Sequence, residues 1–599
     1  MDRKIKCTQK QLATFYGISI LFLSSLFIFT NWLPRYPDAF GYLSSAKFIS
    51  DSSNFTWCSI TESMNSYYAY GYGIFISILF KIFDSYQMIS RGIFIFNITL
   101  LIGIYVFLIK ITDRLLDNLP AKIRYSLCFI ICLYPPYLYQ IYVVSPEILA
   151  IFLTAATVYL FIKLEESTNI MYSVLLGTVV SFMPAVHGRC LGIWAICVVV
   201  ICFMMLFRKI KINQFICFLI ITIIGILIYR YVNDIIKADV FILKGNDTPN
   251  NSFTFVSKSI LSIFSVSGII NILTSLFTQL FYLGSTTFLI SFVGLSSFIV
   301  LIFEKIKYLI KNREIKFNKY DFTKIYICLS AFAIMFLSSV LFRIPRRMDH
   351  VLYGRHNEMF LPFIIVLGYS YLSKKRAKRK IIFFCSGILL ICSLIVYIRL
   401  TNGNFSISIP RTIIGLSLFY DTIINNYSSV FMIALISILS VVLYLYLSHK
   451  YKRTFITYTF FILVCVAQLC TSYKAITTER EEDFNTRSVF WSVQSLLDYN
   501  EIEIYAVNKK KSSSKAYLLQ LMAMDKEVNY LTGNQIVDAI QESDSCGLIY
   551  SDKKIDLNLS NKECYYVSNI LENSDAEIWI YGHKYAEYLI KKGFILIPV

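Results

Sequence analysis

The chain contains 599 residues, of which 56% are hydrophobic and only 16% are charged. This composition excludes a set of soluble domains and indicates a polytopic α-helical membrane protein. The formal net charge is +19, but Lys and Arg occur in short clusters between apolar runs. That is the pattern of the positive-inside rule, so nucleic-acid binding is not expected.

Apolar runs of the length needed to cross a membrane, about 20 residues, recur along the chain. About thirteen spans are expected, at 12–33, 91–110, 125–142, 147–163, 171–186, 190–207, 214–232, 281–303, 324–342, 359–373, 381–399, 429–448 and 454–472. With a cytoplasmic N-terminus, every dense Lys/Arg cluster falls on the cytoplasmic side. The first run is too long for the apolar part of a signal peptide and lacks a cleavage site, so it is interpreted as an uncleaved span. We therefore expect a multi-pass protein of the cell (plasma or inner) membrane.

Two segments between spans are predicted to lie outside the cell. Residues 34–90 form a large first external loop. Within it, the apolar run Ile74–Phe83 is too short to cross and is expected to lie along the interface. Residues 233–280 form a second outer loop, with an interfacial helix expected near Ser257–Leu273.

After Tyr473 the hydropathy falls, and strand and helix patterns alternate. Strands are expected at Ile502–Val507, Val528–Leu531, Gly547–Tyr550 and Ile578–Tyr581, and helices at Ser514–Met524, Gln535–Gln541 and Lys584–Lys592. This alternation predicts a small α/β domain. Residues 1–472 would form the transmembrane domain and residues 473–599 the extracytoplasmic domain. Cys546 and Cys564 are possible disulfide partners there, and the sequence leaves their pairing open.

The first external loop opens on an acidic residue at the membrane boundary. Asp38, Tyr42 and Ala46 recur at a four-residue spacing, which places them on one face of a helix. A carboxylate on such a face suits a general base that faces a cavity. Pro37-Asp38 is also an ordinary helix start, where the helix dipole favours a carboxylate. The spacing leaves both interpretations open.

Two further polar sites interrupt the apolar runs on the same side. Glu147 follows Ser145-Pro146 at the start of a predicted span, where it either begins the helix or helps to place a substrate. Arg189 follows His187-Gly188 with almost no loop. A guanidinium at that depth usually faces a cavity or a partner, and the alternative is an interfacial Arg beside a bystander His. No metal motif accompanies either site.

The external stretch 343–358 departs from the positive-inside pattern. It holds Arg343, Arg346, Arg347 and Arg355, together with Tyr353, His356 and Glu358. Because guanidinium groups bind phosphate in a forked geometry, a lipid phosphate is a natural counterpart. The alternative is an ordinary solvated loop, which applies less to Arg355 because this residue lies beside a span.

Together these features resemble the GT-C glycosyltransferases that use polyprenyl-phosphate sugars, such as protein O-mannosyltransferases and the aminoarabinose transferase of lipid A. The resemblance rests on Asp38-x3-Tyr42-x3-Ala46, the run from Ala69 to Asp84, Tyr134-Pro135 before Ser145-Pro146-Glu147, His187-Gly188-Arg189, and Tyr353-Gly354-Arg355 with Pro362. It covers about residues 1–375. The prolines of the family are missing from 69–84, and His356 stands where the family has Tyr, so the sugar and the subfamily stay open.

The resemblance implies a role for each of these residues. Asp38 would be the general base on an acceptor hydroxyl, Arg355 and Arg189 would hold the lipid phosphate, and Glu147 would orient donor or acceptor. The other residues expected to contact substrate are Tyr42, His187, Tyr353, His356 and Glu358. The donor would be a polyprenyl-phosphate sugar, and the acceptor a lipid, a glycan or a protein. A single displacement would invert the anomeric carbon. No cofactor is expected, although some relatives bind a metal and a divalent ion is left open.

Two other functions fit a chain of this kind. A glycan polymerase or ligase would use a lipid-diphosphate donor. A lipid or glycan transporter would show internal repeats and charges at the membrane midplane. The charged candidates here gather at one face, which favours an enzyme with an outward-facing site.

Overall fold

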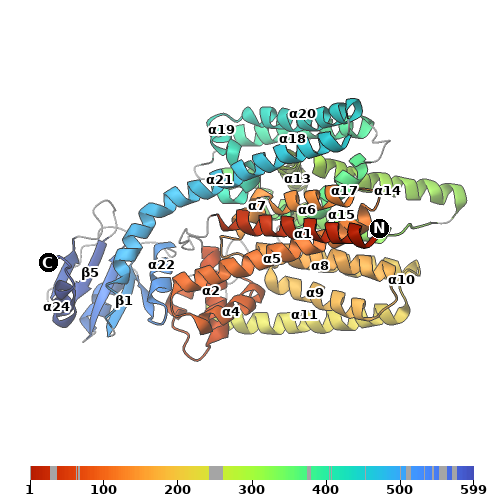
Figure 1. The fold of residues 1–599 in the computed structure, drawn as a ribbon. Helices are drawn as coiled ribbons and strands as arrows, with labels where there is room; N and C mark the ends of the chain where they lie inside the picture. Colours follow the sequence, from red (N-terminus) through yellow and green to blue (C-terminus); the bar gives the residue numbers. More distant parts are fainter. Residues whose placement is uncertain are drawn as a thin grey trace.

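The structure is a computed structural model of the chain. It describes residues 2–26, 37–62, 64, 68–241, 261–313, 315–373, 379–403, 405, 408–451, 453–499, 501–507, 514–531, 533–542, 545–551, 563–568 and 577–598. Among these residues, eight helices are long and apolar enough to cross a membrane, and four shorter apolar helices accompany them. The described residues therefore form a helical membrane protein with a small C-terminal sheet (Figure 1).

Helices α1 to α11 build the first half of the bundle. Their bounds are α1 (Asp2–Ser25), α2 (Pro37–Ser50), α3 (Cys58–Thr61), α4 (Gly71–Ile82), α5 (Tyr86–Leu115), α6 (Ala121–Cys132), α7 (Pro135–Gln140), α8 (Glu147–Glu166), α9 (Met171–Val186), α10 (Cys190–Leu206) and α11 (Ile212–Phe241). Helix α1 includes the first part of the predicted span at 12–33, and residues 27–36 lie outside the described residues.

The second half runs from η1 to the long helix α21. Its elements are η1 (Ser262–Phe264), α13 (Val266–Thr286), α14 (Ile290–Asn312), α15 (Asp321–Leu341), α16 (Met348–Val351), η2 (Asn357–Met359), α17 (Leu361–Ser373), α18 (Arg379–Thr401), η3 (Pro410–Thr412), η4 (Ile414–Phe419), α19 (Tyr420–Asn425), α20 (Ser429–Lys450) and α21 (Arg453–Gln494). Figure 1 shows α21 leaving the bundle and leading to the sheet, which lies at one end of the molecule next to α2.

The predicted span at 281–303 has the wrong bounds. Residues 266–280, which were expected to form loop and interfacial helix, are the start of α13, and the helix breaks at Phe288 and Leu289, which have positive φ values of 49° and 66°. Buried polar side chains at Ser275, Thr278 and Gln279 explain the low apparent hydropathy. The first part of the predicted helix at Ser257–Leu273 lies outside the described residues.

The two helices on either side of this break both contact α18. Gly284 at the end of α13 packs near Leu389 of α18, and Ser296 of α14 hydrogen-bonds to Cys385 one turn earlier in α18. The predicted span at 125–142 is also interrupted, because α6 ends at Cys132 and Pro135-Pro136 begin the short helix α7.

The short apolar run predicted to lie at the interface forms α4, which has 12 residues. Its side chains Ile74, Phe75, Ile78 and Ile82 are exposed. A helix of this length rises about 18 Å, which is well below the thickness of the hydrocarbon core. The interfacial placement of α4 remains a prediction.

The C-terminal part folds as the alternation of patterns predicts. Its elements are β1 (Ile502–Val507), α22 (Ser514–Ala523), β2 (Val528–Leu531), α23 (Gly533–Glu542), β3 (Cys546–Ser551), β4 (Cys564–Val567), β5 (Glu577–Tyr581), α24 (His583–Lys591) and β6 (Leu596–Pro598). The strand order is β2-β1-β3-β5-β4-β6, parallel from β2 to β3 and antiparallel beyond. Strands β4 and β6 were not predicted. Helix α21 runs straight through the predicted domain boundary at 472/473.

The strand order keeps Cys546 and Cys564 from forming a disulfide with each other. Cys546 lies in β3 and Cys564 in β4, and β5 lies between these strands. Strands separated by a third are about 9.5 Å apart, which is too far for a disulfide. The thiol of Cys546 instead donates to the carbonyl oxygen of Glu501 at 3.1 Å.

Candidate active site

Four charged residues that lie far apart in the sequence meet at the ends of four elements. Asp38 is in the first turn of α2, and Glu147 is in the first turn of α8. Arg189 is the residue before α10, and Arg355 lies between α16 and η2. The helix dipole favours the two carboxylates, Asp38 and Glu147, because each lies in the first turn of its helix. The structure thus brings together all four residues that the sequence singled out.

Glu147 is the centre of this cluster. Its Oε1 accepts a hydrogen bond from Arg355 Nε at 2.8 Å, and its Oε2 pairs with Arg189 Nη2. The Glu147 side chain is only 4% exposed and that of Arg189 only 5%. A carboxylate is costly to bury without partners, so the two guanidiniums compensate it. Glu147 holds the two arginines in one place.

Asp38 lies at the open side of the cluster. Its Oδ2 is 3.5 Å from Arg355 Nη1, and its Oδ1 accepts from the hydroxyl of Tyr68 at 3.4 Å. The Asp38 side chain is 38% exposed, in contrast to that of Glu147. Of the two carboxylates, Asp38 is therefore the one that a reacting group can reach.

Arg189 keeps one unused donor inside the protein. Its Nε points at the sulfur of Met359 at 3.2 Å, and its Nη2 pairs with Glu147. The remaining Nη1 is buried and has no hydrogen-bond partner among the described residues. A buried charged donor without an acceptor is costly, so an anionic group that fills this position would stabilise the site.

The two histidines lie beside the arginines. The rings of His187 and His356 are 5.9 Å apart. Burial, with the nearby positive charge of Arg189, lowers the pKa of His187 to about 3 and that of His356 well below its usual value. Both rings are therefore neutral at physiological pH. The contact of these two histidines with a substrate stays a prediction. As neutral rings they would contribute hydrogen bonds to a substrate, and no positive charge.

The two predicted tyrosines are packed as parts of the wall. The Tyr353 ring stacks on Phe342 at 4.1 Å, and its hydroxyl lies 3.4 Å from Nε2 of His356. Tyr42 is buried, and its ring meets Tyr68 edge-on at 5.7 Å. Ala46 is also fully buried on α2. Tyr42 reaches the charged cluster through Tyr68, which bonds to Asp38, and Tyr353 lies beside His356.

Glu358 is a second buried carboxyl group close to the cluster. It accepts a hydrogen bond from the hydroxyl of Tyr282 at 2.7 Å. Burial raises its pKa to about 8; the bond from Tyr282 and the charges of Arg189 and Arg355 oppose this rise, and Glu147 adds to it. Glu358 is therefore mostly protonated at neutral pH, and it adds little negative charge to the site.

A segment 60 residues away in the sequence backs the loop of Arg355. The carbonyl oxygen of Thr412 accepts from the amides of Gly354 and Arg355 at 3.1 and 3.2 Å. Asp349, fully buried, accepts from the hydroxyl of Thr412 at 2.8 Å and from Arg347 at 2.9 and 3.1 Å. Arg347 was expected to be available to an anion and instead anchors this loop. Its sequence neighbour Asp349 was the signal for that pairing.

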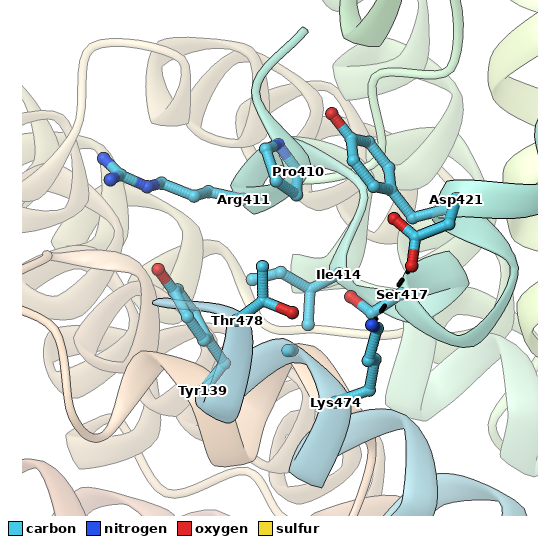
Figure 2. A pocket seen from close by; sticks show the side chains of 10 residues that line it. Tyr139, Pro410, Arg411, Ile414, Ser417, Asp421, Lys474 and Thr478 are labelled. Carbon is cyan, nitrogen blue, oxygen red and sulfur yellow. Dashed lines mark ion pairs between the residues drawn. The ribbon is translucent and has the colours of Figure 1, made fainter. Parts of the chain in front are cut away.

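The same segment lines a small open pocket between η3, η4, α7 and α21 (Figure 2). Tyr139 and Thr478 face it from opposite helices. Lys474 of α21 points to Asp421 of α19, and their charged atoms are 3.1 Å apart. The long helix that leads to the sheet domain is thus attached to the segment that supports Arg355.

The sequence did not single out Tyr68, Tyr282 or Thr412. Tyr68 lies in an aromatic run before α4, and its ring lies against Gly41 of α2, where a Cβ would come within 2.4 Å of it. Tyr282 and Thr412 lie in segments without any catalytic pattern. Among the described residues, no group of three or more His, Cys, Asp or Glu side chains could hold a metal ion.

The fold of this chain is similar to that of solved membrane-protein structures. No family model matches the sequence, and no curated protein matches it. ArnT from Cupriavidus metallidurans in the apo state is similar in structure, with a TM-score of 0.51 and 9% identity over 95% of this chain and 97% of that chain. ArnT from the same organism bound to undecaprenyl phosphate gives a TM-score of 0.51 with 10% identity over the same shares. These relatives are GT-C membrane proteins. The chain therefore has the fold of the GT-C superfamily glycosyltransferases.

Proposed function

We propose that this protein is a membrane glycosyltransferase that moves a sugar from a polyprenyl-phosphate donor to a hydroxyl on a lipid, glycan or protein at the outer face of the cell membrane. The observation that carries the proposal is the arrangement of one reachable carboxylate, Asp38, beside two arginines held on Glu147. The ArnT structure bound to undecaprenyl phosphate supports the class of donor.

The charges of the site suit a lipid phosphate. The negative charges of Asp38 and Glu147 balance the positive charges of Arg189 and Arg355. Glu358 is mostly protonated, so the side chains of the site together are close to neutral. A phosphate would take the unused Nη1 of Arg189 and the Nη1 of Arg355, whose contact with Asp38 is long at 3.5 Å. Forked guanidiniums bind phosphate oxygens well, particularly where water is excluded.

The reaction needs one proton acceptor and one stabilised leaving group. Asp38 takes the proton from the acceptor hydroxyl while its oxygen forms a bond to the anomeric carbon. The bond from that carbon to the phosphate oxygen breaks, and the phosphate leaves with the electron pair. A phosphate needs no general acid, because the arginines stabilise its charge. One displacement of this kind inverts the anomeric carbon.

The test is transfer by the purified protein in phospholipid vesicles. Radiolabelled undecaprenyl-phosphate hexoses and pentoses are supplied one at a time with a membrane lipid and glycan extract as acceptor. Label in the acceptor, with release of undecaprenyl phosphate, is the expected result. Transfer only from an undecaprenyl-diphosphate donor would identify a ligase or polymerase instead. No transfer from any donor would overturn the proposal.

Asp38→Asn should abolish transfer, because it removes the base while it keeps the size of the side chain. Its binding of undecaprenyl phosphate should stay near that of the wild type, since both arginines remain. The control is Asp51→Asn, an aspartate just after the same helix whose carboxylate bonds to Ser53 and Asn54. Full activity of Asp38→Asn would remove Asp38 from the role of base.

Arg355→Ala should weaken the binding of undecaprenyl phosphate at least about 10-fold, because a charge-assisted contact contributes about 1.5–3 kcal/mol. Arg343→Ala is the matched control, since the Arg343 guanidinium bonds to the carbonyl of Val340 and makes none of the contacts of the cluster. Binding is measured by titration of the lipid into the protein in detergent. An unchanged affinity of Arg355→Ala would exclude Arg355 as a phosphate ligand.

A further inference from the structure

The helix that carries Asp38 has a second face, which meets the C-terminal domain. Successive residues of a helix turn by about 100°, so Phe40 lies about 200° around α2 from Asp38. Lys47, seven residues after Phe40, lies on the same face as Phe40. Asp38 thus faces the arginines, whereas Phe40 and Lys47 face away from them.

Phe40 is enclosed between two aromatic rings. Its ring lies 5.0 Å from that of Trp57 and 5.1 Å from that of Tyr517, with interplanar angles of 17° and 19°. Trp57 belongs to the first loop, and Tyr517 belongs to α22 of the sheet domain. The Phe40 and Trp57 side chains are fully buried, and Tyr517 is 2% exposed. The ring of Phe40 is thus held by both parts of the molecule.

Three polar contacts fix the same junction. The indole Nε1 of Trp57 donates to the carbonyl oxygen of Met524 at 2.7 Å, within the protein. Lys47 Nζ pairs with Asp525 at 2.5 Å. Ser59, in α3, accepts from the amide of Tyr530 in β2 at 2.8 Å. All partners on the domain side come from α22, β2 and the turn between them, which Figure 1 shows next to α2.

The turn that makes these contacts is itself held rigidly. Gln520 is fully buried; its amide donates to the carbonyl oxygen of Lys526 at 2.8 Å, and its side-chain oxygen accepts from the amide of Val528 at 3.1 Å. Lys526 in turn donates to the carbonyl oxygens of Leu497 and Tyr499 at 2.6 and 2.5 Å. A movement of the sheet domain therefore moves this turn, and with it the residues stacked on α2.

We propose that the C-terminal domain is a mount for the catalytic helix, and that Phe40, Trp57 and Tyr517 are positioning residues that set where Asp38 stands opposite Arg355. This inference rests on the proposed function for the role of Asp38. Catalytic groups displaced by about 1 Å lose on the order of 10²-fold in rate. Helix α4 holds the other end of α2, where Gly73 packs against Ser45 and Ala46, so the mount at Phe40 acts on the end that carries Asp38.

The primary test is Tyr517→Ala, with Tyr517→Phe as the conservative variant and Tyr585→Ala as the matched control. Tyr585 is fully buried in the same domain, where its hydroxyl donates to the carbonyl oxygen of Leu496 and its ring lies 5.4 Å from that of Tyr499 at a tilted angle. Tyr517→Ala should lower kcat about 10- to 100-fold at an unchanged KM for the undecaprenyl-phosphate sugar that the wild type uses. Tyr517→Phe should keep at least half of kcat, because it keeps the stacked ring.

Amide hydrogen exchange of α2 gives a measurement that does not depend on sugar transfer. Tyr517→Ala should speed exchange over residues 38–46 at least about 10-fold, and Tyr585→Ala should leave it unchanged. If no donor is used by the wild type, the proposed function fails, and this exchange experiment alone still decides whether the domain mounts α2. Equal losses of kcat in Tyr517→Ala and Tyr585→Ala, or unchanged exchange in Tyr517→Ala, would overturn the inference.

A surface variant tests the same junction without risk to folding. Asp525 is 74% exposed, and Asp525→Lys would place a positive charge opposite Lys47. We expect a fall in kcat of about 3- to 10-fold at unchanged KM, and recovery in the double variant Lys47→Asp/Asp525→Lys, in which the charges are exchanged. A single variant with the kcat of the wild type would contradict the mount.

Discussion

At the scale of single residues, the site depends on one buried carboxylate that serves two cations. Glu147 is 4% exposed and pairs with Arg189 and Arg355. The sequence left open whether this residue merely starts α8 or has a role in the site, and its position in the first turn of α8 satisfies both. The structure shows that the two arginines come from separate segments, Arg189 from the residue before α10 and Arg355 from the loop before η2.

Glu147→Gln should destabilise the protein by about 3–5 kcal/mol, because it leaves the buried Arg189 without a carboxylate and Arg355 with only its longer contact to Asp38. Thermal unfolding in detergent measures this loss as a lower Tm. Undecaprenyl phosphate should raise the Tm of the variant more than that of the wild type, since its phosphate replaces the missing charge. Glu62→Gln, in the first loop, is the control. A Tm equal to that of the wild type would contradict the central position of Glu147.

Glu358 makes the stability depend on pH in a direction that follows from its raised pKa of about 8. Between the ordinary pKa of a glutamate, about 4.5, and 8, the folded protein keeps a proton that the unfolded chain releases. The contribution to stability is complete below this window and is lost as the pH rises through it. The Tm of Glu358→Gln should therefore decrease less between pH 6 and pH 9 than the Tm of the wild type. Parallel Tm curves for the variant and the wild type would contradict a protonated Glu358.

At the scale of elements, helices α14 and α17 cross at two glycines. A Cβ on Gly294 would come within 2.2 Å of the carbonyl oxygen of Ile364, and a Cβ on Gly368 within 2.2 Å of that of Ile290. The absence of side chains lets the two backbones approach each other, as small residues do at crossings of membrane helices. Helix α17 begins two residues after η2, so a crossing that holds α17 in place also helps to fix the loop of Arg355.

Gly294→Ala and Gly368→Ala should each lower the free energy of unfolding by about 1–3 kcal/mol. The new methyl group would meet backbone atoms, which cannot change rotamer as a side chain can. Gly387→Ala is the control, because a Cβ there meets no atom within 4 Å and alanine is the better helix former. Unfolding in detergent measures all three variants. Equal stability of Gly294→Ala and Gly387→Ala would show that the helices are not in close contact at this crossing.

At the scale of the whole molecule, the positive-inside pattern and the position of the site make one prediction about sidedness. The sheet domain and the end of the bundle that carries Asp38 should lie on the same, extracytoplasmic side. Lys307→Cys, near the end of α14, and Asp525→Cys, in the turn between α22 and β2 that contacts α2, test this. An impermeant maleimide on intact cells should label Asp525→Cys and leave Lys307→Cys unlabelled, with the unsubstituted protein as background. Labelling in the opposite sense would invert the proposed topology.

Much of the architecture follows from local patterns in the sequence. Apolar runs give most of the spans, and alternation of strand and helix gives four strands and three helices of the C-terminal domain at nearly the observed bounds. The residues Asp38, Glu147, Arg189 and Arg355 could also be selected, because charges at the ends of apolar runs are unusual. The break at 287–289 was missed because buried polar side chains in α13 lower the hydropathy on which span prediction depends.

What the sequence by itself determined is therefore the membrane class, the two-part organisation and the identity of the charged residues, since each is encoded within about 20 neighbouring positions. Only the tertiary structure decided which residues meet. Glu147 joins Arg189 and Arg355 at sequence separations of 42 and 208 residues, and Lys47 joins Asp525 at a separation of 478. Contacts over such distances depend on how helices pack against one another, and no local period in a single sequence records that packing.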